Sequence, residues 1–194
     1  MTRPAKSRIR YCIAIIALLA LGFSVLRQFE FSPNALVIVV LCLVLPGRFA
    51  SFFWRDFYAG LELMQRRDYP NARINLERFV HRIRQQRWMK KLIYCKWGIY
   101  TWDIEAMALN NLGSTLLQLT DPAGAESHFV AALNLDSGFP LPYANLAIVH
   151  FARGNADEAV RYLDRSRVLG YYGLDEEAAK REAQTIRARL GSNA

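Results

Sequence analysis

Residues 109–132 read LNNLGSTLLQLTDPAGAESHFVAA, and residues 143–166 read YANLAIVHFARGNADEAVRYLDRS. The second stretch repeats the size pattern of the first with a shift of 34 residues. The matching positions are Leu112 and Leu146, Gly113 and Ala147, Ala125 and Ala159, and Phe129 and Leu163. A repeat of this length, with apolar residues at helical spacing, predicts helix pairs that stack on one another.

The boundaries of these helices are also marked in the sequence. Asp103 and Glu105 supply the negative charge that the start of a helix favours. Asp121 and Asn155 suit the N-cap position of the second helix of each pair, and Gly170 ends the last of them. The predicted helices are residues 106–119, 122–135, 140–152 and 156–169.

The two units resemble the tetratricopeptide repeat family, in which small residues lie where two helices cross and large residues fill the groove between them. The first unit carries the family pattern as Leu109, Leu112, Gly113, Leu116, Ala125, Phe129 and Ala132. The second carries it as Tyr143, Leu146, Ala147, His150, Ala159, Leu163 and Ser166. The resemblance implies a helical solenoid that binds proteins or peptides and catalyses no reaction.

Further helices are predicted on both sides of these units. The residues that fit an earlier, degenerate pair are Gly60, Leu63, Ala72, Leu76 and Phe79. The step of twelve residues from its glycine to its alanine equals that of the first complete unit, and an insertion of nineteen residues follows it. Residues 175–190 alternate charged residues with alanine, which is expected of the polar capping helix of a solenoid.

The composition bounds the number of domains and the chemistry. The 194 residues carry a net charge of +8, three cysteines and three histidines. Without the apolar N-terminal region, roughly 140 residues remain, which is enough for one domain with its own core. The cysteines and histidines form no metal-ligand or disulfide pattern, and no phosphate-binding loop or nucleophile motif occurs. We therefore expect a reducing compartment, no enzyme activity, no metal and no cofactor.

Two apolar runs, residues 11–26 and 35–45, precede the repeats. A helix over the first run is about 24 Å long, and flanking arginines can extend it toward the roughly 30 Å of membrane hydrocarbon. The alternatives are a cleaved signal peptide for the first run and a re-entrant or interfacial segment for the second, which Pro33 and Pro46 bracket. Because cations crowd before the first run and after the second, we expect a multi-pass protein of the inner membrane with both ends in the cytoplasm.

Asn111 and Asn145 are 34 residues apart and should project from equivalent places on the concave face of the solenoid. A side-chain amide there can donate to and accept from the backbone of an extended peptide, although each amide could equally bond a neighbouring helix. The apolar residues predicted on the same peptide-binding face are Met107, Leu141, Ile148 and Phe151. Family members that clasp acidic tails carry Lys or Arg there, so this face favours an apolar ligand segment.

The insertion after the first pair interleaves cations with aromatic residues. The residues predicted to contact the membrane surface are Arg82, Arg84, Arg87, Trp88, Lys90, Lys91 and Trp97. One alternative is an elongated second helix whose aromatic residues pack on the repeats. The other is nucleic-acid binding by base stacking, which we do not favour.

The sequence thus predicts an all-α protein with an N-terminal transmembrane hairpin, a helical-repeat solenoid and a C-terminal capping helix. The parts are residues 1–50 (tail and hairpin), 51–100 (degenerate pair and insertion), 101–170 (two complete units) and 171–194 (cap and tail). We expect a scaffold that docks a protein or peptide on the cytoplasmic side of the lipid bilayer. Two other functions remain open: an accessory subunit of a membrane enzyme or transport complex that acts through the hairpin, and a nucleic-acid-binding protein.

Overall fold

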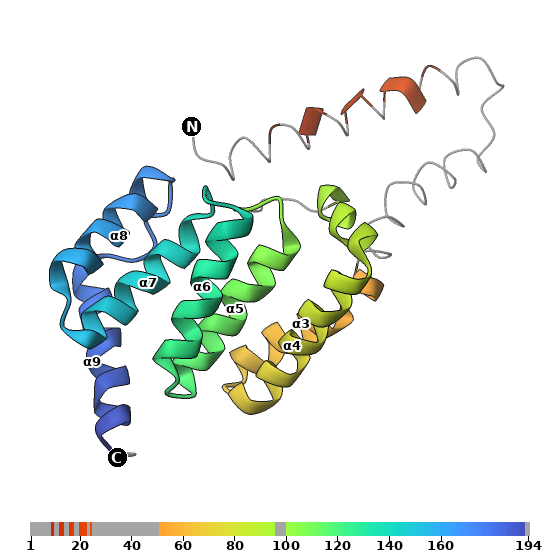
Figure 1. Cartoon of the computed structure of the whole chain (residues 1–194). Coiled ribbons are helices and arrows are strands. Elements are labelled where there is room, and N and C mark those ends of the chain that lie inside the picture. The colour runs from red at the N-terminus through yellow and green to blue at the C-terminus, as the bar shows by residue number, and fades with distance from the viewer. Residues whose placement is uncertain are drawn as a thin grey trace.

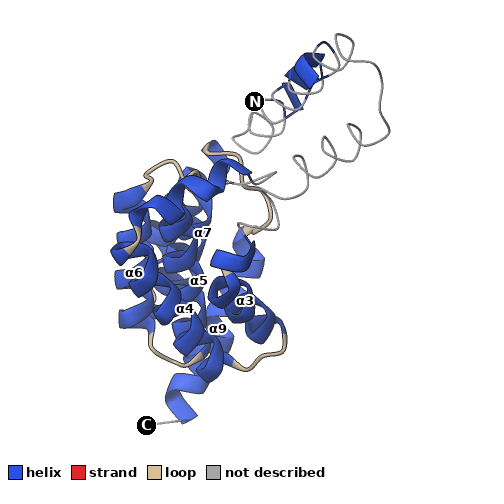
Figure 2. Cartoon of the chain, turned by 90° about the vertical axis from the view of Figure 1, so that its right-hand side faces the viewer, coloured by secondary structure: helices blue, strands red, loops and turns tan. Residues whose placement is uncertain are grey.

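The computed structural model describes residues 51–95 and 100–192, together with separate positions between 9 and 24. All regular structure within these residues is helical (Figure 2). The elements are α3 (Arg55–Gln65), α4 (Tyr69–Gln85), the 3₁₀ segment η1 (Arg87–Cys95), α5 (Ile104–Gln118), α6 (Pro122–Leu135), α7 (Pro140–Arg153), α8 (Ala156–Val168) and α9 (Glu176–Ser192). The pairs α3/α4, α5/α6 and α7/α8 follow one another across the molecule (Figure 1), and α9 packs against α7.

The helix ends follow the signals in the sequence. The side chains of Asp103 and Asp121 accept hydrogen bonds from backbone N–H groups in the first turns of α5 and α6. Asn155 occupies the N-cap position of α8 as expected, but its side chain makes no capping bond. Gly154 and Gly170 end α7 and α8 with φ values of +88° and +95°, which glycine adopts without steric cost.

The two helices of a pair cross closely at a glycine. A Cβ atom on Gly113 of α5 would lie 2.6 Å from Cε1 of Phe129 and 3.0 Å from the carbonyl oxygen of Ala125, both in α6. A Cβ atom on Gly60 of α3 would lie 2.8 Å from Cγ of Leu76 in α4. The degenerate first pair is therefore present, and its helices cross in the same way.

The insertion does not continue α4. Gln86 leaves the helical conformation with φ −113° and ψ 68°, and η1 begins at the next residue. Met89 and Ile93 of η1 are buried, and Nε1 of Trp54 donates a hydrogen bond to the backbone oxygen of Met89 at 3.3 Å. The elongated-helix alternative is wrong, because these apolar side chains fold the segment back onto the first pair.

Within the described residues, no helix is long and apolar enough to cross a membrane. The second apolar run, residues 35–45, lies outside the described residues, and the first is described only at separate positions. Among those positions Ile13, Ile16 and Leu21 are helical, and they are 60%, 64% and 63% exposed. The hairpin stays a prediction.

Candidate protein-binding site

The face predicted to bind a peptide consists of one stripe on α5 and one on α7, and we call it the binding face. Its members are Met107 and Asn111 on α5, and Leu141, Asn145, Ile148 and Phe151 on α7. The two helices are neighbours and are joined by side-chain hydrogen bonds, so the two stripes are adjacent. The two halves of the binding face nevertheless differ in what covers them.

Asn145 connects the two helices. Its Nδ2 atom donates to Oδ1 of Asn110 at 2.9 Å and to Oγ of Ser114 at 3.2 Å. Both amide hydrogens are therefore used within the chain, which matches the alternative that this residue bonds a neighbouring helix. Asn110 is buried, so the bond from Asn145 also satisfies a polar group that water cannot reach.

Asn111 has the opposite environment, although it holds the equivalent place in its own repeat. Its backbone oxygen accepts a hydrogen bond from the Thr115 hydroxyl, but its half-buried side-chain amide has no hydrogen-bond partner within the described part of the chain. Met107, one turn earlier on α5, is also half-buried. The α5 half of the binding face thus offers an amide and an apolar side chain to a ligand.

The α7 half of the binding face is covered by α9. Phe151 is 8% exposed and borders Ala183 and Arg187 of α9, across a cavity of about 100 Å³. The Nζ atom of Lys180 lies 5.9 Å from the centre of the Phe151 ring. Ile148, one turn earlier on the same stripe, is 3% exposed. These two residues were expected on an open concave surface, and the structure differs because α9 packs against α7 instead of extending the stack beyond α8.

Side chains near both ends of α9 also reach the ends of α5. The Tyr171 ring, before α9, lies 6.0 Å from the Tyr100 ring, before α5. At the other end, Nη1 of Arg189 donates to Oε1 of Gln118 at 2.8 Å. Burial raises the pKa of the Glu182 carboxyl above its ordinary value, against the opposing effect of the Arg189 cation. α9 therefore runs in the same direction as α5 along the binding face.

A cleft of about 330 Å³ remains between α9 and the turn from α3 to α4. The residues that line it are Arg67, Tyr69, Gln118, Glu182, Thr185, Ile186 and Arg189. Gln118 stands at the end of the α5 stripe, so the cleft adjoins the open half of the binding face.

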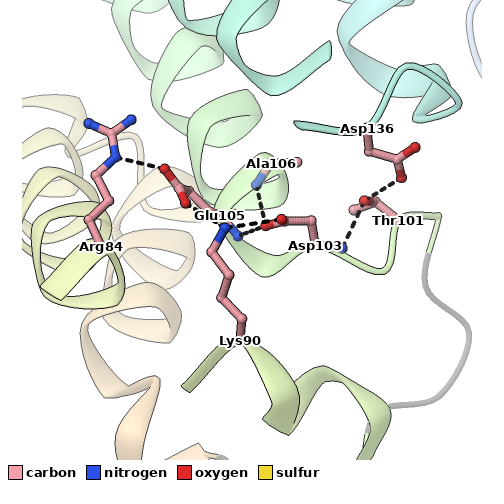
Figure 3. Close-up of polar contacts among 7 residues, drawn as sticks. All are labelled: Arg84, Lys90, Thr101, Asp103, Glu105, Ala106 and Asp136. Carbon is pink, nitrogen blue, oxygen red and sulfur yellow. Dashed lines mark hydrogen bonds and ion pairs between the residues drawn. The ribbon is translucent and has the colours of Figure 1, made fainter. Parts of the chain in front are cut away.

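Part of the basic insertion is bound to the start of α5 (Figure 3). Nε of Arg84 lies 2.6 Å from Oε1 of Glu105, while Nζ of Lys90 lies 2.7 Å from Oε2 of Glu105 and 3.1 Å from Oδ2 of Asp103. Burial alone would raise the pKa of Glu105, but the hydrogen bonds from Lys90 and Arg84 outweigh it and lower this pKa. Burial would also lower the pKa of Lys90, and its bonds to the two carboxylates raise it instead.

These ion pairs change the predicted membrane contact. Arg84 and Lys90 hold carboxylates of α5, and Nη2 of Arg82 lies 2.6 Å from Oδ2 of Asp56 in α3. These three cations are thus paired with buried or half-buried carboxylates of the fold, and their contact with lipid stays a prediction. Trp97 lies outside the described residues.

The remaining residues of the insertion form an exposed group with the start of the first pair. Phe52 is 66% exposed and Trp88 is 46% exposed, and the Phe53 ring packs edge-on against Trp88 with centres 4.9 Å apart. Arg87 and Lys91 flank Trp88 and are exposed, with no ion pair to another described residue. We call Phe52, Arg87, Trp88 and Lys91 the aromatic-basic surface.

The stacked pairs, the glycine crossings and the interhelical bond from Asn145 define a helical-repeat protein. The sequence model of the tetratricopeptide repeat matches residues 143–169, which comprise most of α7 and all of α8. Comparison with curated proteins and with solved structures found no match. Residues 143–169 therefore form a tetratricopeptide repeat, and a repeat of this family indicates a scaffold for protein interactions.

Two features of the site were not predicted from the sequence. The bond between Asn145 and Asn110 was not predicted because equivalent positions of the two repeats are 34 residues apart, whereas these two residues are 35 apart. The packing of α9 against the repeats could have been predicted from Ala179, Ala183 and Ile186. These residues recur at helical spacing on an otherwise polar segment, which indicates a helix with one buried face. No group of His, Cys, Asp or Glu suited to a metal ion occurs among the residues that the structure describes.

Proposed function

We propose that this chain is a membrane-anchored adaptor whose binding face docks a partner protein or peptide on the cytoplasmic side of the inner membrane. The observation that supports docking is the open α5 half of the binding face. Asn111 has an unused amide there, Met107 is half-buried, and the cleft of about 330 Å³ begins at Gln118. A peptide laid along α5 can bond the amide through its backbone and place an apolar side chain on Met107. Proteins with this repeat are generally non-catalytic, and we propose the same here.

Site-specific photo-cross-linking in native membranes tests the docking. A photoreactive residue at position 107 of the full chain should give a cross-linked product with the partner, and Asn111→Ala should weaken that product. The matched control is the same probe at Ser127, which is exposed on α6. Equal products from both positions, or a product that Asn111→Ala leaves unchanged, would argue against the α5 half as the docking site.

Two observations support membrane anchoring. Ile13, Ile16 and Leu21 of the first apolar run are helical and exposed, as lipid-facing residues are. The aromatic-basic surface combines large apolar rings with free cations, which suits the headgroup region of an anionic bilayer. Extraction of membranes with alkaline carbonate tests the anchor, because an anchored chain stays with the membranes. Recovery of the chain in the supernatant would refute it.

A further inference from the structure

α9 occupies the α7 half of the binding face as a bound helix would. Its buried stripe is Ala179, Ala183 and Ile186, none of them more than 2% exposed. Most of its other residues are charged or polar, so α9 is amphipathic with a narrow apolar stripe. The surface of α7 that receives this stripe is therefore shaped for a helix with small side chains.

Arg187 and Arg189 bond α9 to α7 and to α5. Arg187 donates from Nε to the backbone oxygen of Ala152 at 2.9 Å and from Nη2 to that of Phe151 at 3.0 Å. These oxygens belong to the last turn of α7, and that of Phe151 also accepts a hydrogen bond from the backbone N–H of Gly154. α9 packs mainly against α7, so its release uncovers the α7 half of the binding face and breaks the Arg189 bond to Gln118, while the three pairs stay in contact.

We propose that the α7 half of the binding face docks an amphipathic helix of a partner protein, and that α9 is the internal occupant which this helix displaces. The proposal rests on the proposed function, because it specifies a ligand for the same face. The partner helix carries two small residues and one aliphatic residue at the spacing of Ala179, Ala183 and Ile186. An arginine directly after the aliphatic residue reaches the last carbonyl oxygens of α7. Such a helix binds only molecules in which α9 has left α7, so its apparent affinity is its intrinsic affinity multiplied by the fraction of these open molecules.

A fluorescent peptide of residues 174–192 is the probe for this site, because its sequence already fits α7. Its binding to the full chain in detergent micelles is measured by fluorescence anisotropy. Arg187→Ala removes both bonds to the α7 carbonyls, and Arg181→Ala is the matched control, because Arg181 lies exposed on the same helix. Arg187→Ala should bind the peptide about tenfold more tightly than the wild type or Arg181→Ala. A peptide that carries Ala183→Arg should not bind.

A second variant opens the site more fully. Ala183→Arg in the full chain places a charge against Phe151, which should expel α9 and give the tightest peptide binding. The proposal would be overturned if the peptide bound the wild type, Arg187→Ala and Ala183→Arg with equal affinity. Variants that dimerise and bind no peptide would also overturn it, since a second copy of the chain would then supply the helix. Cross-linking from position 107 does not depend on α9, so it reports separately on the proposed function.

Discussion

Replacement of Gly113 by alanine tests how tightly α5 and α6 cross. The new methyl group would lie 2.6 Å from Cε1 of Phe129 and 3.0 Å from the carbonyl oxygen of Ala125. The Phe129 ring is fully buried and the Ala125 carbonyl is part of the backbone, so neither can yield without a shift of α6. We expect the two helices to be forced apart.

The cost can be estimated from this geometry. Overpacking costs about 1–3 kcal/mol, and the rigid neighbours of Gly113 place its replacement near the upper end of that range. Alanine recovers about 1 kcal/mol through its better helix propensity. The free energy of unfolding should therefore fall by about 2 kcal/mol. In a chain of this size the melting temperature should fall by roughly 4–8 °C.

Two other glycines provide controls for this measurement. A Cβ atom on Gly60 would lie 2.8 Å from Cγ of the fully buried Leu76 side chain, and its nearest backbone atom is 3.5 Å away. A Cβ atom on Gly191 would have nothing within 4 Å. Gly60→Ala should lower the melting temperature less than Gly113→Ala, because only the Leu76 side chain and no backbone atom has to move, and Gly191→Ala should leave it unchanged or raise it by up to roughly 2–4 °C. Far-ultraviolet circular dichroism of the full chain in detergent measures all three. The reasoning fails if Gly113→Ala melts at or above the wild-type temperature, or if Gly60→Ala loses more.

Three further outcomes are expected. Asn145→Ala leaves the buried Asn110 amide oxygen without its donor and should lower the free energy of unfolding by about 1–3 kcal/mol. Asn111→Ala should change this free energy by no more than about 0.5 kcal/mol. Similar losses in thermal unfolding would mean that the two amides have the same role. Hydrogen bonds outweigh burial and lower the pKa of Glu105, so its contribution to stability is present above a pH of about 4.3 and is lost as the pH falls through the lowered pKa. Glu105→Gln should flatten that part of the curve of melting temperature against pH, and an unchanged slope would assign the acid sensitivity to other carboxylates. A reporter active only outside the cytoplasm, fused after Ala194, should stay silent, and strong activity would leave a single membrane crossing.

The helix pairs were predictable because their signals are local. The twelve-residue step from Gly113 to Ala125 contains the end of one helix, the cap of the next and the two small residues of the crossing. The same step from Gly60 to Ala72 identified the degenerate pair without any strong family pattern. Such patterns are complete within one repeat, so a single sequence contains enough information to identify them.

The surroundings of the binding face depend on contacts between distant segments. Charge and aromatic content suggested a lipid-facing insertion, but whether Lys90 faces lipid or Glu105 depends on the fold of η1 against α5. Likewise, the stripe of Ala179, Ala183 and Ile186 shows that α9 buries one face, but not which helix receives it. A small-residue stripe fits many helix surfaces, so the choice of α7 could not be made from spacing alone.

The bond between Arg189 and Gln118 joins residues that are 71 positions apart. A repeat stack held only by contacts between neighbours behaves as a one-dimensional array, and its end units can fray singly. Here the last helix is bonded to α5 as well as to α7, so loss of the C-terminal end also breaks a contact of the preceding unit. The two complete units should therefore unfold with greater cooperativity than their nearest-neighbour contacts alone would give.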